Sequence, residues 1–330
     1  MPEIYSTAPV RWGVLATGRI ATTFATDLNL VDGAELAAVA SRTGASARAF
    51  AAEHGAERAY GSYPELLADP GVDIVYVATP HGRHAEDVMA CLEAGKSVLC
   101  EKPITLNAGQ ARSLVGEARR RGLFLAEAMW MRCHPNIRRI RELVRAGACG
   151  TVRQVRADLG IVAAPDLPRM WDPALGASAL LDIGVYPLTF ASLLLGEPED
   201  VRAVAALSGR GIDVNGGATL SYADGSIASV TWSQVAWSDS QASVAGDGGR
   251  IEVASRMNHP PSFAHVRNWE SDTFSEPVLG HGLAHEIVEA SDCVRAGRTE
   301  SELLPLDETV AMMGVMDRIR EQVGVRYAVD

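Results

Sequence analysis

The chain has few cysteines, and they do not form a metal site or a disulfide framework. Five occur among 330 residues, an odd number, at positions 91, 100, 133, 149 and 293. None belongs to a C-x-x-C pair, so the spacing excludes the usual zinc patterns. Cys133 and His134 are adjacent but have no further ligand at metal spacing, and we expect no metal. Reduced thiols in a cytoplasmic protein are the expectation.

The chain also lacks an excess of positive charge. It carries 30 Lys and Arg against 41 Asp and Glu, a formal net charge of -11. A nucleic-acid partner would require a basic surface, so we expect none. No apolar run approaches the roughly 18 residues of a membrane span, and the N-terminus has no secretory apolar core. We therefore expect no membrane partner either.

What the chain does contain is a regular alternation of apolar runs and helical patterns in its first third. Four of the runs are VRWGVLAT (10–17), AELAAVAS (34–41), VDIVYVATP (72–80) and KSVLCEKP (96–103). Continuous apolar runs separated by helices are typical of strands buried on both faces of a parallel doubly wound sheet. The predicted fold class is therefore α/β for residues 1–127, the first domain.

The pattern changes in residues 128–330. A helix fits 135–147, and several strands then follow with little helix between them. Asp-Gly in YADGSIASV (222–230) predicts a hairpin, and two helices are expected at about 283–297 and 307–323. This second domain is predicted to be α+β, built on a mostly antiparallel open sheet.

The first apolar run leads into a tight turn of the kind that binds dinucleotides. Such turns read G-x-G-x-x-G/A, and their second glycine lets backbone amides approach a pyrophosphate at a helix N-terminus. The chain has Ala16-x-Gly18-x-x-Ala21, with Arg19 and Ile20 between. Gly18 is the glycine of close approach, and Ala16 replaces the first glycine. At the first strand of a βαβ unit this predicts a dinucleotide site, with an ordinary turn as the alternative.

The end of the second run indicates which dinucleotide. NAD sites usually place Asp or Glu there for the ribose 2′-hydroxyl, whereas this chain has Ser41, Arg42 and Thr43. An arginine with two hydroxyls suits a 2′-phosphate through charge-assisted hydrogen bonds. We predict NADP(H), with NAD(H) less favoured; the alternative is that Arg42 is a solvated loop residue.

Two further segments follow apolar runs, at the edge where open α/β sheets bind ligands. TPHGRH begins with Thr79 and Pro80, which we assign to the cofactor site, and ends with His84. His84 is either a surface residue at a helix start or a residue near the nicotinamide. The run KSVLC ends in Glu101 and Lys102, before a proline. A buried strand should avoid two charges at its tip unless a site uses them, so both are site candidates.

Together with LLDIGVYPL (180–188), these motifs resemble the Gfo/Idh/MocA oxidoreductase family. E-K-P followed some 80 residues later by D-x-G-x-[HY] is a specific combination, and the motifs occur in the family order. EAMWMR (127–132) and LLDIGVYPL are most similar to the branch with dimeric trans-dihydrodiol dehydrogenases and NADP-dependent xylose dehydrogenases. The resemblance implies a Rossmann domain, a sugar, polyol or cyclic diol substrate, and a homodimer or dimer of dimers through the C-terminal sheet. It also implies a Lys-Pro bond that is often cis.

The resemblance places catalytic and substrate roles on Lys102, Asp182 and Tyr186. Hydride transfer to a carbonyl needs a proton for the developing alkoxide, and the reverse reaction needs a base. Tyrosine has a pKa near 10, which a neighbouring ammonium such as that of Lys102 lowers. Asp182 shares a face with Tyr186 if DIGVY starts a helix, and it then binds substrate hydroxyls or holds Lys102. Which of Lys102 and Tyr186 transfers the proton stays open.

Each of these three residues also has a structural interpretation. Asp182 fits a helix N-cap, Tyr186 a core aromatic, and Lys102 a strand-end residue paired to Glu101. Trp130, Arg132 and Trp171 are candidate substrate-pocket residues, with core or interface positions as the alternative. The chain also departs from the family, because Ala177 and Ala179 interrupt the usual glycine cluster and Asp172 follows Trp171 where relatives often have arginine.

Two other functional classes fit the same residues. One is a glycosidase-like enzyme that uses tightly bound NAD to oxidise a sugar transiently. The other is a non-catalytic sensor that binds a dinucleotide. The 2′-phosphate preference predicted from Arg42 disfavours the first, and the complete set of Lys102, Asp182 and Tyr186 disfavours the second.

Overall fold

The computed structural model describes residues 8–330 and divides the chain into two compact units. The first unit runs to Thr105 and adds Gly109–Cys133 and Val278–Thr309. The second comprises Leu106–Ala108, His134–Pro277 and Val310–Asp330. Each is described by itself below.

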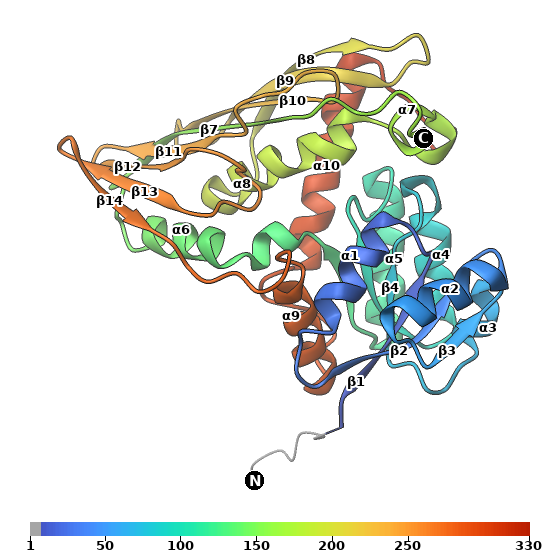
Figure 1. Ribbon diagram of the computed structural model, residues 1–330. Helices are drawn as coiled ribbons and strands as arrows, with labels where there is room; N and C mark the ends of the chain where they lie inside the picture. Colours follow the sequence, from blue (N-terminus) through green and yellow to red (C-terminus); the bar gives the residue numbers. More distant parts are fainter. Residues whose placement is uncertain (1–7) are drawn as a thin grey trace. The chain divides into compact units, whose positions relative to one another are not determined.

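The first unit is built on a six-stranded parallel sheet (Figure 1). Its strands are β1 (Val10–Leu15), β2 (Ala34–Ala40), β3 (Arg58–Tyr60), β4 (Ile74–Val77), β5 (Ser97–Glu101) and β6 (Leu125–Ala128). Their order is β3-β2-β1-β4-β5-β6, and every pairing is parallel. The strand order reverses between β1 and β4, the switch point where open α/β sheets bind ligands beyond the carboxyl ends. The predicted doubly wound sheet is confirmed.

The helices of this unit follow the strands, as the sequence pattern predicts. They are α1 (Arg19–Leu28), α2 (Gly44–His54), α3 (Tyr63–Leu67), α4 (His81–Glu93) and α5 (Ala108–Arg121). The central strands carry almost only apolar side chains, and Val14, Val75 and Leu99 have no exposed surface. Continuous apolar strands are therefore explained by burial on both faces. A short 3₁₀ helix, Trp130–Cys133, ends the unit's continuous part.

A helix from late in the chain, α9 (Ala284–Arg295), completes the first unit. The indole Nε1 of Trp12 in β1 donates to Ser291 Oγ at 3.1 Å. The buried carboxylate of Asp27 in α1 accepts from the backbone N–H of Ala284 at 3.0 Å, which caps the start of α9. The division expected at residues 127 and 128 therefore differs from the structure, because long-range packing returns residues 278–309 to the first unit.

The second unit is built on an eight-stranded sheet (Figure 1). Its strands are β7 (Val152–Gly160), β8 (Asp200–Leu207), β9 (Asp213–Ser221), β10 (Ile227–Ser233), β11 (Ala242–Gly246), β12 (Gly249–Val253), β13 (Phe263–Arg267) and β14 (Glu270–Phe274). The order is β14-β13-β12-β11-β7-β10-β9-β8, and only the β7–β10 pairing is parallel. Strands β9 and β10 form the hairpin predicted from Asp-Gly. The α+β prediction is confirmed.

The helices of the second unit include α6 (Pro135–Arg145), α8 (Val185–Leu195) and most of α10 (Leu306–Val323). Helix α8 packs against β7, β10 and α6. Shorter turns are α7 (Pro168–Trp171), a 3₁₀ turn at Pro173–Leu175 and a π-helix at Leu180–Gly184. The segment Pro173–Leu195 is long and apolar enough to cross a membrane, but 78% of its most apolar window is buried, as expected of a core helix.

Candidate functional site

The predicted dinucleotide turn lies at the carboxyl end of β1. Ala16 has a φ of 78°, a left-handed conformation that costs a non-glycine residue about 1 kcal/mol and explains why a glycine is usual there. Gly18 is the N-cap of α1, and no side chain caps the first amides of that helix. A Cβ atom at Gly18 would meet no heavy atom within 4 Å, so the backbone is open to a ligand. Arg19 and Ile20 are exposed in the first turn of α1.

The residues after β2 are the candidates for binding a 2′-phosphate. Thr17 Oγ1, which sequence reasoning missed, lies 3.2 Å from Ser41 Oγ and so connects the turn after β1 to the end of β2. Arg42 is exposed. The hydroxyl of Thr43 accepts from the N–H of Ser46 and caps α2, so this side chain already has a structural role. Ser41 and Arg42 are therefore the residues of this segment that would bind the 2′-phosphate of a dinucleotide.

The E-K-P turn follows β5, at the carboxyl ends of the parallel strands, and its backbone N–H groups donate to carboxylates. The Glu101 side chain accepts from the backbone N–H of Lys102 at 3.1 Å and from the buried hydroxyl of Tyr76. Burial, together with Glu101, raises the pKa of Tyr76 well above its usual value. Glu101 thus shapes the turn from inside, and Lys102 is half-buried. The Lys102–Pro103 bond is cis, as the resemblance implied.

A second acidic residue under this turn was not predicted from the sequence. Glu127 in β6 is 5% exposed, and its Oε1 accepts from the backbone N–H of Ile104 at 2.9 Å. Burial raises the pKa of Glu127 to about 7, against the opposing effects of the Ile104 N–H, Arg132 and Lys102. The only sequence signal was a lone acid inside the apolar run LFLAEAMW, which is unusual for a buried strand.

The residues after β4 divide between surface and interior. Pro80 is the exposed N-cap of α4, and Thr79 is buried. His84 is fully buried, so its interpretation as a surface residue is wrong. Its two ring nitrogens lie 2.7 Å from the carbonyl oxygen of Pro103 and 2.8 Å from that of Thr79. Both ring nitrogens therefore face backbone carbonyls. That His84 lies near the nicotinamide stays a prediction.

Arg132 and Trp171, both pocket candidates, each donate to a backbone carbonyl. The Arg132 guanidinium donates from Nε to the Leu303 carbonyl at 2.8 Å and forms an ion pair with Glu308. Its side chain is 9% exposed, so the structural alternative describes it better than substrate binding. Trp171 Nε1 donates to the Ala164 carbonyl at 2.9 Å, while the residue stays partly exposed. Trp130 begins the 3₁₀ helix and is half-buried.

The D-x-G-x-Y residues lie on one continuous helical segment of the second unit. Asp182 belongs to the π-helix at Leu180–Gly184, and Tyr186 is in the first turn of α8. They are 8% and 7% exposed. Asp182 is within the helix and not at its N-cap, so that alternative is wrong. Single π-helical turns inside α-helices occur frequently at functional sites.

Sequence reasoning also missed the cationic partner of Asp182. Arg169 in α7 donates from Nη1 to Asp182 Oδ2 at 3.0 Å. The guanidinium is half-exposed, with 50% of its side-chain surface accessible, whereas the carboxylate is 10% accessible. Asp182 thus carries an ion pair that leaves part of Arg169 available to a ligand.

The start of the π-helix is held by a buried acid on β9, Asp213. Its carboxylate accepts from Ser178 Oγ at 2.5 Å, from the Leu180 N–H at 2.7 Å and from Trp232 Nε1 at 2.9 Å. Burial raises the pKa of Asp213, and these three donors oppose the effect. A Cβ at Gly184 would approach the Trp232 ring to 3.0 Å, so glycine allows the helix to rest on the indole. Asp213 therefore fixes the segment that carries Asp182 and Tyr186.

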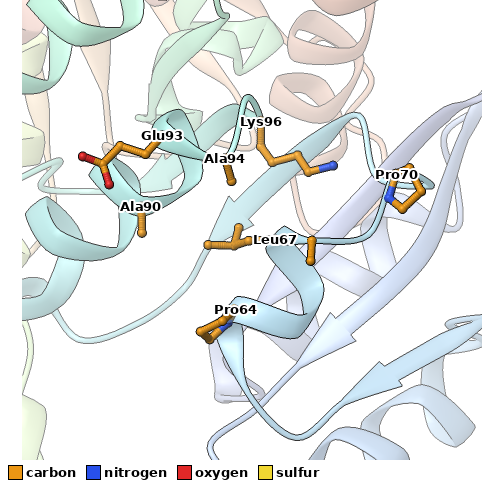
Figure 2. A pocket seen from close by; sticks show the side chains of 8 residues that line it. Pro64, Leu67, Pro70, Ala90, Glu93, Ala94 and Lys96 are labelled. Atoms are coloured by element: carbon orange, nitrogen blue, oxygen red, sulfur yellow. The ribbon is translucent and has the colours of Figure 1, made fainter.

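A shallow hollow elsewhere in the first unit is not part of this chemistry (Figure 2). Pro64 and Leu67 of α3, Ala90 and Glu93 of α4, and Lys96 are among the residues that line it. Lys96 precedes β5, whereas Lys102 follows it, so the hollow lies at the opposite edge of the parallel sheet. Lys96 Nζ donates to the carbonyls of Asp69 and Val72 at 2.6 and 3.0 Å, a structural role.

The sequences of both units match models of one known family. Residues 10–128 match the oxidoreductase family with an NAD-binding Rossmann fold, and residues 137–252 match the GFO/IDH/MocA C-terminal domain. The chain belongs to the Gfo/Idh/MocA family. It is therefore an oxidoreductase with a nicotinamide dinucleotide-binding domain, and the resemblance seen in the sequence is confirmed.

Characterised members of the Gfo/Idh/MocA family align with nearly the whole chain. Trans-1,2-dihydrobenzene-1,2-diol dehydrogenase of Sus scrofa is 34% identical over 97% of this chain and 99% of its own length. D-xylose 1-dehydrogenase (NADP(+)) of Hypocrea jecorina is 39% identical over 96% of this chain and 93% of its own.

Solved structures of the Gfo/Idh/MocA family extend this agreement to the fold. KijD10, a 3-ketoreductase of Actinomadura kijaniata solved with NADP and TDP-benzene, has a TM-score of 0.86 and 30% identity. It covers 97% of this chain and 99% of its own. Aldose-aldose oxidoreductase of Caulobacter crescentus has a TM-score of 0.88 at 23% identity, over 96% of this chain and 98% of its own, which supports the fold alone.

Proposed function

We propose that this protein is an NADP(H)-dependent dehydrogenase or reductase of a sugar, a polyol or a cyclic diol. The observation that carries the proposal is the residue set. Lys102 follows β5 at the ligand-binding edge of the parallel sheet, and Asp182 and Tyr186 lie almost buried on one helical segment. The relatives that align over nearly the whole chain are named for the oxidation of a diol and of xylose.

The cofactor assignment follows from the turns after β1 and β2. The open backbone at Gly18 and the uncapped amides of α1 would hold the pyrophosphate. Ser41 and Arg42 would hold the 2′-phosphate, since an acid that would bind a 2′-hydroxyl is missing there. A dinucleotide held by these residues would supply hydride transfer to or from the substrate carbon. One relative is named for NADP(+), and KijD10 was solved with NADP, which supports the choice.

The chain's own residues manage the proton and the orientation of the substrate. Lys102 and Tyr186 exchange the proton of the reacting hydroxyl, and the ammonium stabilises the charge that develops on oxygen. Asp182 accepts hydrogen bonds from substrate hydroxyls, and Arg169 holds its carboxylate in place. Solved forms of KijD10 include a lysine-to-alanine and a tyrosine-to-phenylalanine variant, so the same two residue types have been varied in a neighbour.

A homodimer through the eight-stranded sheet is part of the proposal. The outward side chains of β8–β10 are mostly small or uncharged, such as Thr219, Ser229 and Thr231. Val204 and Ile227 lie on the same strands and are 76% and 45% exposed. A partly apolar, weakly charged sheet face suits a second copy. Val204→Asp should convert the dimer to a monomer in sedimentation velocity, with the wild type dimeric; a monomeric wild type would contradict this part.

The function is tested by an absorbance screen at the NADPH band across aldoses, inositols, keto-sugars and cyclic diols. Wild-type turnover is expected with NADP⁺ for hydroxyl substrates or with NADPH for keto-sugars, and Lys102→Met and Tyr186→Phe should each lower kcat by at least 100-fold. Tyr222→Phe is the control, because the buried Tyr222 hydroxyl has no hydrogen-bond partner among residues 8–330. Full turnover in both site variants would refute the roles. Glycoside cleavage without net NADPH change, or tight NADP binding without turnover, would favour the alternative classes.

A further inference from the structure

His84 joins the E-K-P turn to the end of the neighbouring strand. The residue belongs to α4, and its ring has no exposed surface. Nδ1 lies 2.7 Å from the carbonyl oxygen of Pro103, the residue after Lys102. Nε2 lies 2.8 Å from the carbonyl oxygen of Thr79, which follows β4. One side chain therefore bridges two backbone segments at the ligand-binding edge of the sheet.

Both contacts are with oxygen atoms that can only accept hydrogen bonds. A neutral imidazole has one N–H donor and one lone-pair nitrogen, so it can satisfy only one of two carbonyls. At the other carbonyl two lone pairs would face each other in a dry interior, where an unmade hydrogen bond is costly. A ring with a proton on each nitrogen donates to both oxygen atoms and satisfies the observed geometry.

The charges around the ring decide whether this state is possible. The pKa of His84 is lowered from its usual value, first by burial and further by Lys102, while the two carbonyls and Asp87 act in the opposite direction. The two short contacts with acceptor oxygens favour the doubly protonated ring in spite of this direction. Asp87 in α4 is 4% exposed, and Arg83 donates to its Oδ1 at 2.8 Å. Its Oδ2 has no hydrogen-bond partner in the described chain, so some of its negative charge remains to balance a cation. The ring of His81, also in α4, has its centroid 5.6 Å away.

We propose that His84 is a positioning residue for Lys102, and that at neutral pH its ring carries a proton on both nitrogens and donates to the Pro103 and Thr79 carbonyls. The proposal rests on the proposed role of Lys102. Holding the Pro103 carbonyl fixes the Pro103–Ile104 peptide, one residue beyond Lys102, and so limits how the turn that carries the lysine side chain can move. Loss of one ring proton at higher pH would release one carbonyl and loosen the turn.

The first test is NMR of the wild-type protein with ¹⁵N-labelled histidine. At pH 7 the His84 ring is expected to show two protonated nitrogens and to lose one proton only at alkaline pH. A neutral His84 ring at pH 7 would overturn the proposal. This NMR measurement needs no turnover, so it tests the protonation of His84 even if the proposed enzymatic function is wrong. The proposed function is tested separately by the activity of the Lys102→Met variant.

The second test is the His84→Gln variant, whose amide nitrogen can donate to one carbonyl but not bridge both. The assay uses NADP⁺ with D-xylose or trans-1,2-dihydrobenzene-1,2-diol, whichever the wild type turns over faster. The variant's kcat should be 10- to 100-fold lower than that of the wild type. Its affinity for NADPH, measured by fluorescence, should differ less than twofold. In the wild type, kcat should fall with rising pH over the range in which NMR shows His84 losing its proton. The His84→Gln variant should lack this fall. His265→Gln is the matched control, because His265 Nε2 meets only the Ala148 carbonyl, at 3.0 Å. Equal kcat and pH profiles in both variants would overturn the proposal.

The lysine content provides a third readout that a general loss of stability would not produce. The chain has two lysines, Lys96 and Lys102, so ¹³C-labelled lysine gives two resolvable ε-carbon signals. His84→Gln should shift the Lys102 signal and leave that of Lys96, at the opposite end of β5, unchanged. An unshifted Lys102 signal would overturn the positioning role even if the variant lost activity.

Discussion

The guanidinium of Arg169 donates a hydrogen bond to the carboxylate of Asp182, with Nη1 3.0 Å from Oδ2. The acid of the D-x-G-x-Y motif therefore has a cationic partner within its own unit. The pair joins the partly exposed α7 turn to the buried π-helix. An ion pair at this position orients a carboxylate through a charge-assisted hydrogen bond.

Replacing Arg169 by Ala should lower kcat/KM for the substrate about tenfold, mainly through KM, because Asp182 loses the partner that orients it. Stability should change by less than about 1 kcal/mol, since half of the Arg169 side-chain surface is exposed. Steady-state kinetics and thermal unfolding measure the two effects. Arg210→Ala is the control, because Arg210 donates to the Trp171 carbonyl in the same region without contacting Asp182. Identical kinetics for the two variants would contradict the role.

Replacing Asp213 by Asn should destabilise the second unit and impair catalysis. The carboxylate accepts from three donors, and an amide in its place must turn an N–H toward at least one of them. An unmade hydrogen bond in the interior costs about 1–3 kcal/mol of unfolding free energy, measurable in urea. kcat should fall as well, since the π-helix carries Asp182. Asp224→Asn is the control, because Asp224 accepts from Ser226 in an exposed hairpin turn. Comparable effects of both substitutions would argue against a special role of Asp213.

Replacing Arg42 by Ala should reverse much of the cofactor preference. The guanidinium would lose charge-assisted bonds to the 2′-phosphate, so kcat/KM for NADPH should fall about 10- to 100-fold. The value for NADH should stay within a factor of about two, because NADH has no phosphate at that position. Arg48→Ala, an exposed arginine in α2, is the control. An unchanged preference for NADPH in the Arg42 variant would sink the assignment.

The buried Glu127 predicts a specific pH dependence of stability. Its pKa is raised by burial to about 7, from 4.5 in the unfolded chain. The folded protein therefore favours the protonated acid, and this contribution is complete below pH 4.5 and is lost as the pH rises to about 7. Linkage sets the loss at roughly 3 kcal/mol.

Glu127→Gln should remove this dependence, because the amide is uncharged and its oxygen can still accept from the Ile104 N–H. Urea unfolding at pH 5 and pH 8 should show a wild-type loss of stability that the variant lacks. The exposed Glu53→Gln variant should behave like the wild type. If the Gln variant lost as much stability as the wild type between these pH values, the acid would not be the cause.

The sequence predicted the fold best where local patterns are sufficient. The apolar runs identified the parallel strands, and Asp-Gly in residues 222–230 identified the β9–β10 hairpin. The sequence predicted α9 as a helix but did not place it in the first unit. That placement depends on its contacts with Trp12 and Asp27. Packing between residues more than 250 positions apart leaves no signal in a local window.

For the site, the sequence identified motif residues but not their partners. Lys102 was singled out because a charge pair is unusual at the tip of an apolar run, whereas Asp182 and Tyr186 came from the resemblance to the family. The sequence assigned His84 and Arg132 to ligands, whereas the structure shows the first between two carbonyls and the second paired with Glu308. A hydrogen-bond partner is a property of three-dimensional position, which residue type alone does not specify.

The sequence by itself determined that this chain forms a doubly wound sheet followed by a mostly antiparallel open sheet, and that residues such as Gly18 and Lys102 stand at strand ends. Periodicity and turn chemistry are local properties, so they can be read from neighbouring residues. The tertiary structure alone decided that Arg169 balances Asp182, that Asp213 holds the π-helix, and that His84 supports the turn at Lys102. The physical reason is that desolvation and hydrogen-bond satisfaction depend on which groups are brought together once water is excluded.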